Sequence, residues 1–72
     1  MVEKIDDIGF EIMKLRENKN ISQEDLAIEL NIFQSKLSKI ESGKTKKIDI
    51  ITLISICHFF SISLSEFLQY IL

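Results

Sequence analysis

Apolar residues recur along this chain at steps of three and four positions, which is the spacing of one face of an α-helix. In no segment do apolar and polar residues alternate strictly enough to predict a strand. The helical spacing falls into five segments, at about 5–18, 22–30, 33–42, 50–60 and 64–72. The pattern therefore predicts an all-α fold, a compact bundle of about five short helices, with residues 1–72 forming a single domain.

Capping residues separate these segments. Ser22, Asp49 and Ser63 each precede one of them, and their side chains can accept hydrogen bonds from the first free amides of a helix. Asn31 and Gly43 each follow a segment, and both residue types tolerate the left-handed backbone that commonly ends a helix. Residues 22–42 are therefore predicted to form a helix-turn-helix, two short helices joined by a tight turn.

The segment at 50–60 contains more apolar residues than one buried face needs. Its predicted core stripe is Ile50, Leu53, Ile54, Cys57 and Phe60. Further apolar residues lie outside this stripe or at the C-terminal end, where a monomer would favour polar groups. We therefore expect a homodimer whose interface contains Ile51, Phe59, Phe67, Tyr70, Ile71 and Leu72. The alternative is that these residues thicken the core of a small domain.

The charge distribution changes the picture that the total charge gives. The net charge is −2, yet residues 31–47 contain five lysines and one glutamate and so have a net charge of +4. Because neutralisation of phosphates supplies most non-specific affinity for DNA, this segment indicates a surface that binds nucleic acid.

The helix predicted at 33–42 has one apolar and one polar face. Leu37 and Ile40 mark the packing side, and the opposite side has short polar and basic groups that can hydrogen-bond to base edges in a major groove. The candidate base contacts are Gln34, Ser35, Ser38 and Lys39. The candidate phosphate contacts are Gln23, Lys36, Ser42, Lys44, Lys46 and Lys47. The alternative for Gln23 and Gln34 is that they are ordinary polar residues at helix starts.

Other function classes find little support in the sequence. Cys57 lies in an apolar run that favours a small buried side chain over a nucleophile, and His58, the single histidine, is read as a surface residue. We expect no enzyme activity, no metal and no cofactor. The first residues do not resemble a signal peptide and no apolar run is long enough to span a bilayer, so we expect a cytoplasmic protein without a membrane partner.

Three segments of the chain resemble the phage-repressor and Cro-type (XRE-like) helix-turn-helix family. Residues 22–27 (Ser-Gln-Glu-Asp-Leu-Ala) are similar to the start of its second helix, residues 34–43 to its recognition helix, and residues 60–64 to its final corner. The resemblance implies a lambda-repressor-like fold and a sequence-specific transcription regulator. It further implies a repressor that binds double-stranded DNA as a homodimer on a pseudo-palindromic operator.

The resemblance also gives roles to three further residues. Arg16 and Glu41 match positions at which the family has a partly buried ion pair, and the alternative is two solvated charges. Phe33 stands where the family usually has a serine or threonine cap. It is expected either to extend the core or to contact a thymine methyl group or a sugar.

A different function remains open for the same fold. The acidic total charge and the apolar C-terminal half favour an antitoxin-like or other protein-interaction module as the alternative to a DNA-binding regulator.

Overall fold

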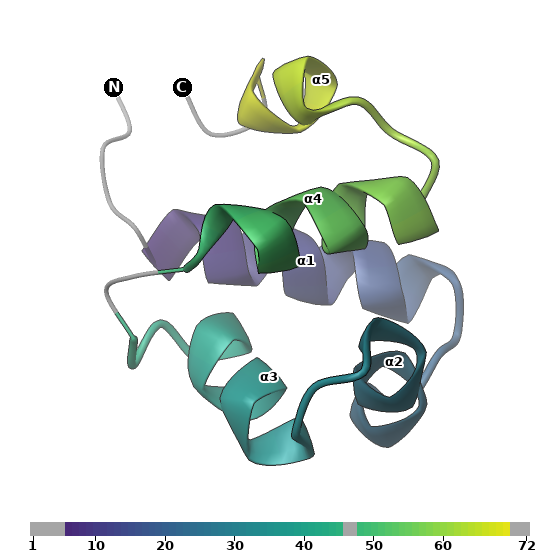
Figure 1. The fold of residues 1–72 in the computed structure, drawn as a ribbon, viewed down its shortest axis with the longest axis vertical. Helices are drawn as coiled ribbons and strands as arrows, with labels where there is room; N and C mark the ends of the chain where they lie inside the picture. The colour runs from purple at the N-terminus through teal and green to yellow at the C-terminus, as the bar shows by residue number, and fades with distance from the viewer. Residues whose placement is uncertain (1–5, 46–47, 70–72) are drawn as a thin grey trace.

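The computed structural model describes residues 6–45 and 48–69, and every regular element in these ranges is an α-helix (Figure 1). The helices are α1 (Asp6–Asn18), α2 (Gln23–Leu30), α3 (Gln34–Glu41), α4 (Ile50–Phe59) and α5 (Leu64–Gln69). The all-α prediction is confirmed, and the boundaries from the end of α1 to the start of α5 lie within a few residues of the predicted ones.

The predicted caps account for these boundaries. Ser22 Oγ accepts a hydrogen bond from the amide of Asp25 at 3.0 Å, and a carboxylate oxygen of Asp49 accepts one from an amide in the first turn of α4 at 2.9 Å. Ser63 and Glu66 form a reciprocal capping box, with both hydrogen bonds at 3.0 Å. Asn31 ends α2 with a left-handed backbone, at φ 57°. These local predictions are confirmed.

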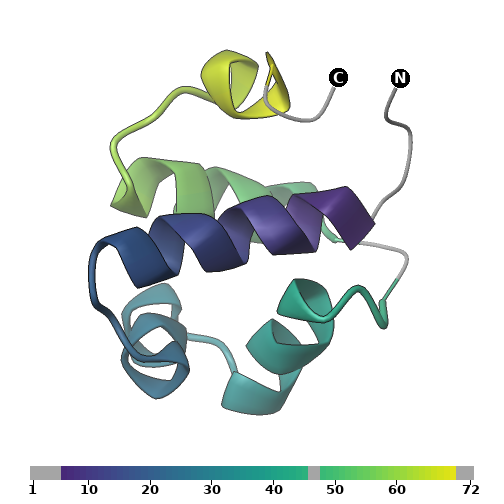
Figure 2. The same ribbon diagram turned by 180° about the vertical axis from the view of Figure 1, so that it is seen from behind.

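The helices are arranged in three levels. α1 and α4 occupy the middle level, α2 and α3 lie on one side of it, and α5 lies on the other side (Figures 1 and 2). The core extends through all three levels. Its buried hydrophobic residues are Ile12, Leu26, Ala27, Leu37, Ile40, Leu53, Ile56, Cys57, Phe60 and Phe67.

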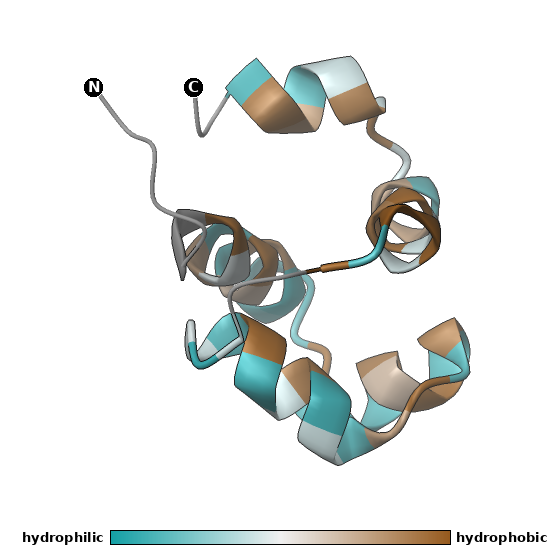
Figure 3. Cartoon of the chain, turned by 60° about the vertical axis from the view of Figure 1, so that its left-hand side comes forward, coloured by the Kyte–Doolittle hydropathy of each residue, from teal (hydrophilic) through white to brown (hydrophobic). Residues whose placement is uncertain are grey.

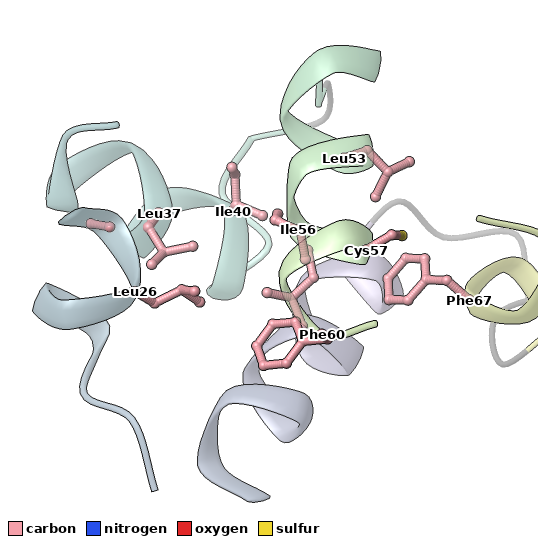
Figure 4. Packing of buried hydrophobic residues seen from close by; sticks show 10 residues of the cluster. Leu26, Leu37, Ile40, Leu53, Ile56, Cys57, Phe60 and Phe67 are labelled. Atoms are coloured by element: carbon pink, nitrogen blue, oxygen red, sulfur yellow. The ribbon is translucent and has the colours of Figure 1, made fainter. Parts of the chain in front are cut away.

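α4 connects the two parts of this core. Leu26 and Leu37 point from the helix-turn-helix toward one side of α4, and Phe67 points from α5 toward its other side, close to Cys57 (Figure 4). The helix-turn-helix is therefore held by apolar contacts on its inner side, which leaves its outer side to the solvent.

The predicted core stripe of α4 is wrong at two positions. Ile50 is 56% exposed and Ile54 is 51% exposed, whereas Thr52 and Ile56 are buried. Seven of the ten side chains of α4 are apolar and they lie on more than one side of the helix, so hydropathy alone did not indicate which side faces inward. Thr52 turns inward because its hydroxyl is hydrogen-bonded to Asp49, which satisfies the polar group in a buried position.

The residues expected at the dimer interface differ in their exposure to solvent. Phe67 is fully buried within the monomer, so it offers no surface to a second copy. Phe59 is half-buried and packs edge-on against Phe60, with 5.0 Å between the ring centroids. Ile51 is 74% exposed, as the prediction required. The remaining interface candidates, Tyr70, Ile71 and Leu72, lie outside the described residues.

A close approach of α1 to α3 was not foreseen from the sequence. Gly9 is buried in α1, and a Cβ atom placed on it would lie 1.9 Å from the carbonyl oxygen of Ile40. The obstacle is backbone rather than the end of a flexible side chain. A side chain at position 9 would therefore force the two helices apart.

We predict that Gly9→Ala lowers the free energy of unfolding by about 2 kcal/mol or more, because an added methyl group in a filled interior costs roughly 1–3 kcal/mol even where side chains can adjust. Urea denaturation measures this change. Alanine is the better helix former by about 1 kcal/mol, so an unchanged or raised stability would contradict the close approach. Ser65→Ala, at an exposed position of α5, is the control and should change stability little.

Candidate nucleic-acid interface

α2 and α3 form the helix-turn-helix, and the turn between them is set by backbone geometry. The amide of Asn31 donates to the carbonyls of Ala27 and Ile28, and the left-handed conformation of Asn31 redirects the chain. Leu26 and Leu37 are fully buried and hold the two helices together. The orientation of α3 relative to α2 therefore follows from one turn residue and a shared core.

The outer face of α3 is polar. Gln34, Ser35, Ser38 and Lys39 are all exposed, whereas the intervening Leu37 is fully buried. Figure 3 shows hydrophilic residues along the side of α3 that faces away from the other helices. The structure thus brings the four candidate base contacts onto one solvent-facing surface.

An ion pair joins the C-terminal end of α3 to α1. Arg16 Nε donates to Glu41 Oε2 at 2.8 Å, and Arg16 Nη2 donates to Oε1 at 3.0 Å. The side chains are only 13% and 4% exposed, and Arg16 also donates to the carbonyl of Ile21. The hydrogen bond to Glu41 raises the pKa of Arg16. The two charges form the partly buried ion pair that the resemblance implied, and the structure shows it to be bidentate.

The same carboxylate begins a chain of hydrogen bonds to the surface. Gln23 Nε2 donates to Glu41 Oε1 at 3.1 Å, and Gln34 Nε2 donates to Gln23 Oε1 at 3.4 Å. The first residue of α2 and the first residue of α3 are therefore linked to the interior ion pair. Sequence spacing gave no signal for this link, because the three residues are brought together only by the fold.

The candidate phosphate contacts lie in different surroundings. Lys44 is exposed in the loop after α3, and Ser42 is exposed at the C-cap, where its hydroxyl donates to the carbonyl of Lys39 at 3.3 Å. Lys36 is also exposed, but its ammonium group lies 3.2 Å from a carboxylate oxygen of Asp49. Lys46 and Lys47 lie outside the described residues.

A small hollow lies beside the polar face of α3. Its volume is about 200 Å³, and it is lined by Ser35, Lys36, Lys39, Ile40 and Thr45. The chain after α3 turns back at Gly43, which has a left-handed φ of 77°, so that this loop forms one wall. Two lysines of α3, Lys36 and Lys39, therefore line the same hollow at the edge of the polar face.

Phe33 precedes α3 without capping it. Its side chain makes no hydrogen bond at the N-cap, and it is 81% exposed. The expectation that Phe33 extends the core is therefore wrong. The phenyl ring is exposed to solvent at the N-terminal end of α3, next to Gln34, the first of the candidate base contacts.

Other chemistry is sparse in the described part of the chain. Cys57 is buried, and desolvation raises the pKa of its thiol, which disfavours the nucleophilic thiolate. Within the described residues no cluster of histidine, cysteine and carboxylate side chains could hold a metal ion. None of the described helices has the length and apolar character needed to cross a membrane.

The comparison with protein families identifies the chain. A family model described as a helix-turn-helix domain matches residues 10–71. The chain belongs to this family. The match includes α2 and α3 together with most of the remaining bundle, and it confirms the XRE-type assignment that the sequence motifs suggested.

Solved structures support the same fold. The wild-type restriction-modification controller protein C.Esp1396I is 29% identical, with a TM-score of 0.77 over 92% of this chain and 84% of its own. SinR, a master regulator for biofilm formation solved in complex with DNA, is 28% identical, with a TM-score of 0.78 over 85% of this chain and 97% of its own. The fold is thus that of DNA-binding transcription regulators.

A third structure shows likeness of fold alone. The clp gene regulator ClgR from Corynebacterium glutamicum is 24% identical, with a TM-score of 0.78 over 86% of this chain. This chain spans 65% of the length of that ClgR chain. The comparison with curated proteins gave no match.

We predict that Phe33→Ser raises the free energy of unfolding by about 1 kcal/mol, because serine supplies the N-cap hydrogen bond that phenylalanine lacks. Thermal or urea unfolding measures the gain. Phe33→Ala is the matched control, since it removes the ring without adding a cap, and it should give no comparable gain. A large loss of stability in both variants would show instead that the ring is packed in solution.

Proposed function

We propose that this chain is a sequence-specific transcription regulator that inserts α3 into the major groove of DNA. The observation that carries the proposal is the exposed polar face of α3, whose first residue is tied through Gln23 to the buried Arg16–Glu41 pair. A side chain that is held before binding loses less conformational freedom on contact with DNA. The link thus favours direct reading of bases over a merely solvated surface.

Base recognition follows from the chemistry of this face. Gln34 has the amide that pairs with N6 and N7 of adenine, and Lys39 can donate to O6 and N7 of guanine. Ser35 and Ser38 lie between them and can bond to several base edges. Phe33 stands at the start of the same face, where its exposed ring can contact a thymine methyl group or a sugar.

Backbone contacts would flank these positions. Gln23 begins α2, where the free amides of the first turn favour an anion. The carboxylates of Glu24 and Asp25 in the same turn oppose this attraction. Ser42 and Lys44 lie at the other end, beyond the last turn of α3. Lys46 and Lys47, which follow in the sequence, are proposed to contact phosphates as well. Contacts at both ends of α3 would fix its register in the groove.

The regulatory effect proposed is repression. A domain that covers an operator excludes other proteins from the same stretch of DNA, which requires no activity beyond binding. The DNA complex of SinR, which is similar in fold and in 28% of aligned residues, supports a DNA partner for this chain.

We predict that Gln34→Ala, Ser35→Ala and Lys39→Ala each relax base preference and cost about 1–3 kcal/mol of binding to an operator selected from random duplexes. Lys44→Ala is the contrasting variant: it should weaken binding to all sequences alike and reduce the slope of log affinity against log salt by about 1. Fluorescence anisotropy over a salt series measures both effects.

The competing function is a protein-interaction module, and the same measurements separate the two. If the wild type shows no salt-dependent binding to mixed-sequence DNA, DNA binding is excluded and a protein partner is favoured. If it binds DNA but all three α3 variants keep the wild-type preference, α3 is not the reading helix.

The proposed active form is a homodimer that joins through the outer face of α4. Ile50, Ile51 and Ile54 are all more than half exposed, and Ile54 borders a hollow that is also lined by Phe59. This is a large apolar area for a surface that meets only water. A two-fold contact would place two α3 helices about 34–36 Å apart, which matches successive major grooves and a pseudo-palindromic operator.

We predict that Ile51→Lys combined with Ile54→Lys raises the dimer dissociation constant at least about tenfold, because two buried charges would lack partners. Ile28→Lys, at an exposed isoleucine of α2, is the control and should leave association unchanged. Sedimentation equilibrium decides the question. A monomeric wild type at micromolar concentration, or a double variant that still dimerises like the wild type, would exclude this interface.

A further inference from the structure

The junction between α3 and α4 contains an ion pair that the charge pattern did not predict. Lys36 Nζ lies 3.2 Å from Asp49 Oδ1, and it also donates to the hydroxyl oxygen of Thr52 at 3.3 Å. Lys36 belongs to α3, whereas Asp49 and Thr52 form the N-cap and first turn of α4. A lysine of the proposed reading helix is therefore bound to the next helix.

Asp49 is held more firmly than an ordinary surface carboxylate. Its Oδ2 accepts from the amide of Thr52 at 2.9 Å, and both of its oxygens lie 2.9 Å from the Thr52 hydroxyl. Thr52 is itself buried, so this anchor does not move freely. The amide hydrogen bond from Thr52, with the hydroxyl and Lys36, lowers the pKa of Asp49 to about 2. The carboxylate is thus charged and prepositioned for Lys36 at neutral pH.

The pair lies at the edge of the proposed DNA surface. Lys36 lines the same hollow as Ser35 and Lys39, both of which are candidate base contacts. An ammonium group at this edge would ordinarily be available to a phosphate. Asp49 both cancels its charge and directs its side chain toward α4.

We propose that Asp49 withholds Lys36 from the DNA backbone and thereby limits the affinity of the α3 surface for DNA of any sequence. This inference rests on the proposed function and assigns Asp49 a positioning role within it. The wild type then makes one phosphate contact fewer than its lysines allow, and the contact becomes available when the carboxylate is removed.

Asp49→Asn tests the inference, because asparagine caps a helix as well as aspartate does but has no charge to hold the lysine. One added phosphate contact steepens the salt dependence by about 0.9, so affinity should fall about 3.5-fold more than in the wild type between roughly 50 and 200 mM salt. Binding of mixed-sequence duplex DNA, followed by fluorescence anisotropy, gives the slope.

Glu11→Gln is the matched control. It removes the same charge and opens another lysine–carboxylate pair, on α1, in which Lys14 Nζ lies 3.0 Å from Glu11 Oε2. The Glu11 side chain is 19% exposed, compared with 53% for Asp49. A general effect of net charge would appear equally in both variants. The inference requires that the slope changes for Asp49→Asn and stays at the wild-type value for Glu11→Gln.

Lys36→Ala in both backgrounds completes the test. In the wild type it should leave the salt slope unchanged, and in Asp49→Asn it should restore the wild-type slope. A slope that falls when Lys36 alone is removed would overturn the inference, because Lys36 would already contact a phosphate. A gain from Asp49→Asn that persists without Lys36 would also overturn it, since Asp49 would then act through its own repulsion.

The outcomes also distinguish this inference from the proposed function. If the wild type binds DNA and the α3 variants relax base preference, but Asp49→Asn keeps the wild-type slope, only the role of Asp49 is excluded. If the wild type binds no DNA at all, the proposed function is excluded and the inference with it. Urea unfolding of Asp49→Asn checks that the cap of α4 is kept.

Discussion

The ion pair between Arg16 and Glu41 is the constraint on which the outer surface depends. It joins α1 to the last residue of α3, and both side chains are largely removed from water. Loss of either partner would strand a buried charge at a cost of about 3–5 kcal/mol. Beside it, Gly9 lets the backbone of α1 approach the carbonyl of Ile40. One polar and one steric contact thus fix the position of α3 in the bundle.

The ion pair also determines how the surface is ordered. Glu41 has further acceptor capacity after binding Arg16, and Gln23 uses it while offering its own carbonyl oxygen to Gln34. The order of the interior therefore extends through the half-buried Gln23 to the exposed Gln34. An exposed glutamine normally samples many rotamers, and restricting it beforehand reduces the entropy that recognition must overcome.

The sequence was sufficient wherever the deciding chemistry was local. Caps such as Ser22 and Asn31 need only a neighbouring amide or a tolerated backbone angle, and each was found where expected. The inward face of α4 was predicted only in part, since seven of its ten residues are apolar and give no single apolar face. Gly9 was missed for a related reason, because its role depends on the backbone of Ile40, which lies 31 residues away in the sequence.

The same distinction applies to Lys36, which the sequence alone places among the phosphate contacts. A count of charges along the chain assigns every lysine of a basic segment the same role, but Asp49 lies thirteen residues away and becomes its partner only through the fold. Pairing a single lysine matters here because the protein as a whole has a net charge of −2 and few lysines are available to DNA. Among the described residues of the basic segment the lysines are Lys36, Lys39 and Lys44, so pairing one of them neutralises a third of that positive charge. For the proposed DNA surface we therefore expect affinity to depend on which lysines are paired more than on how many there are.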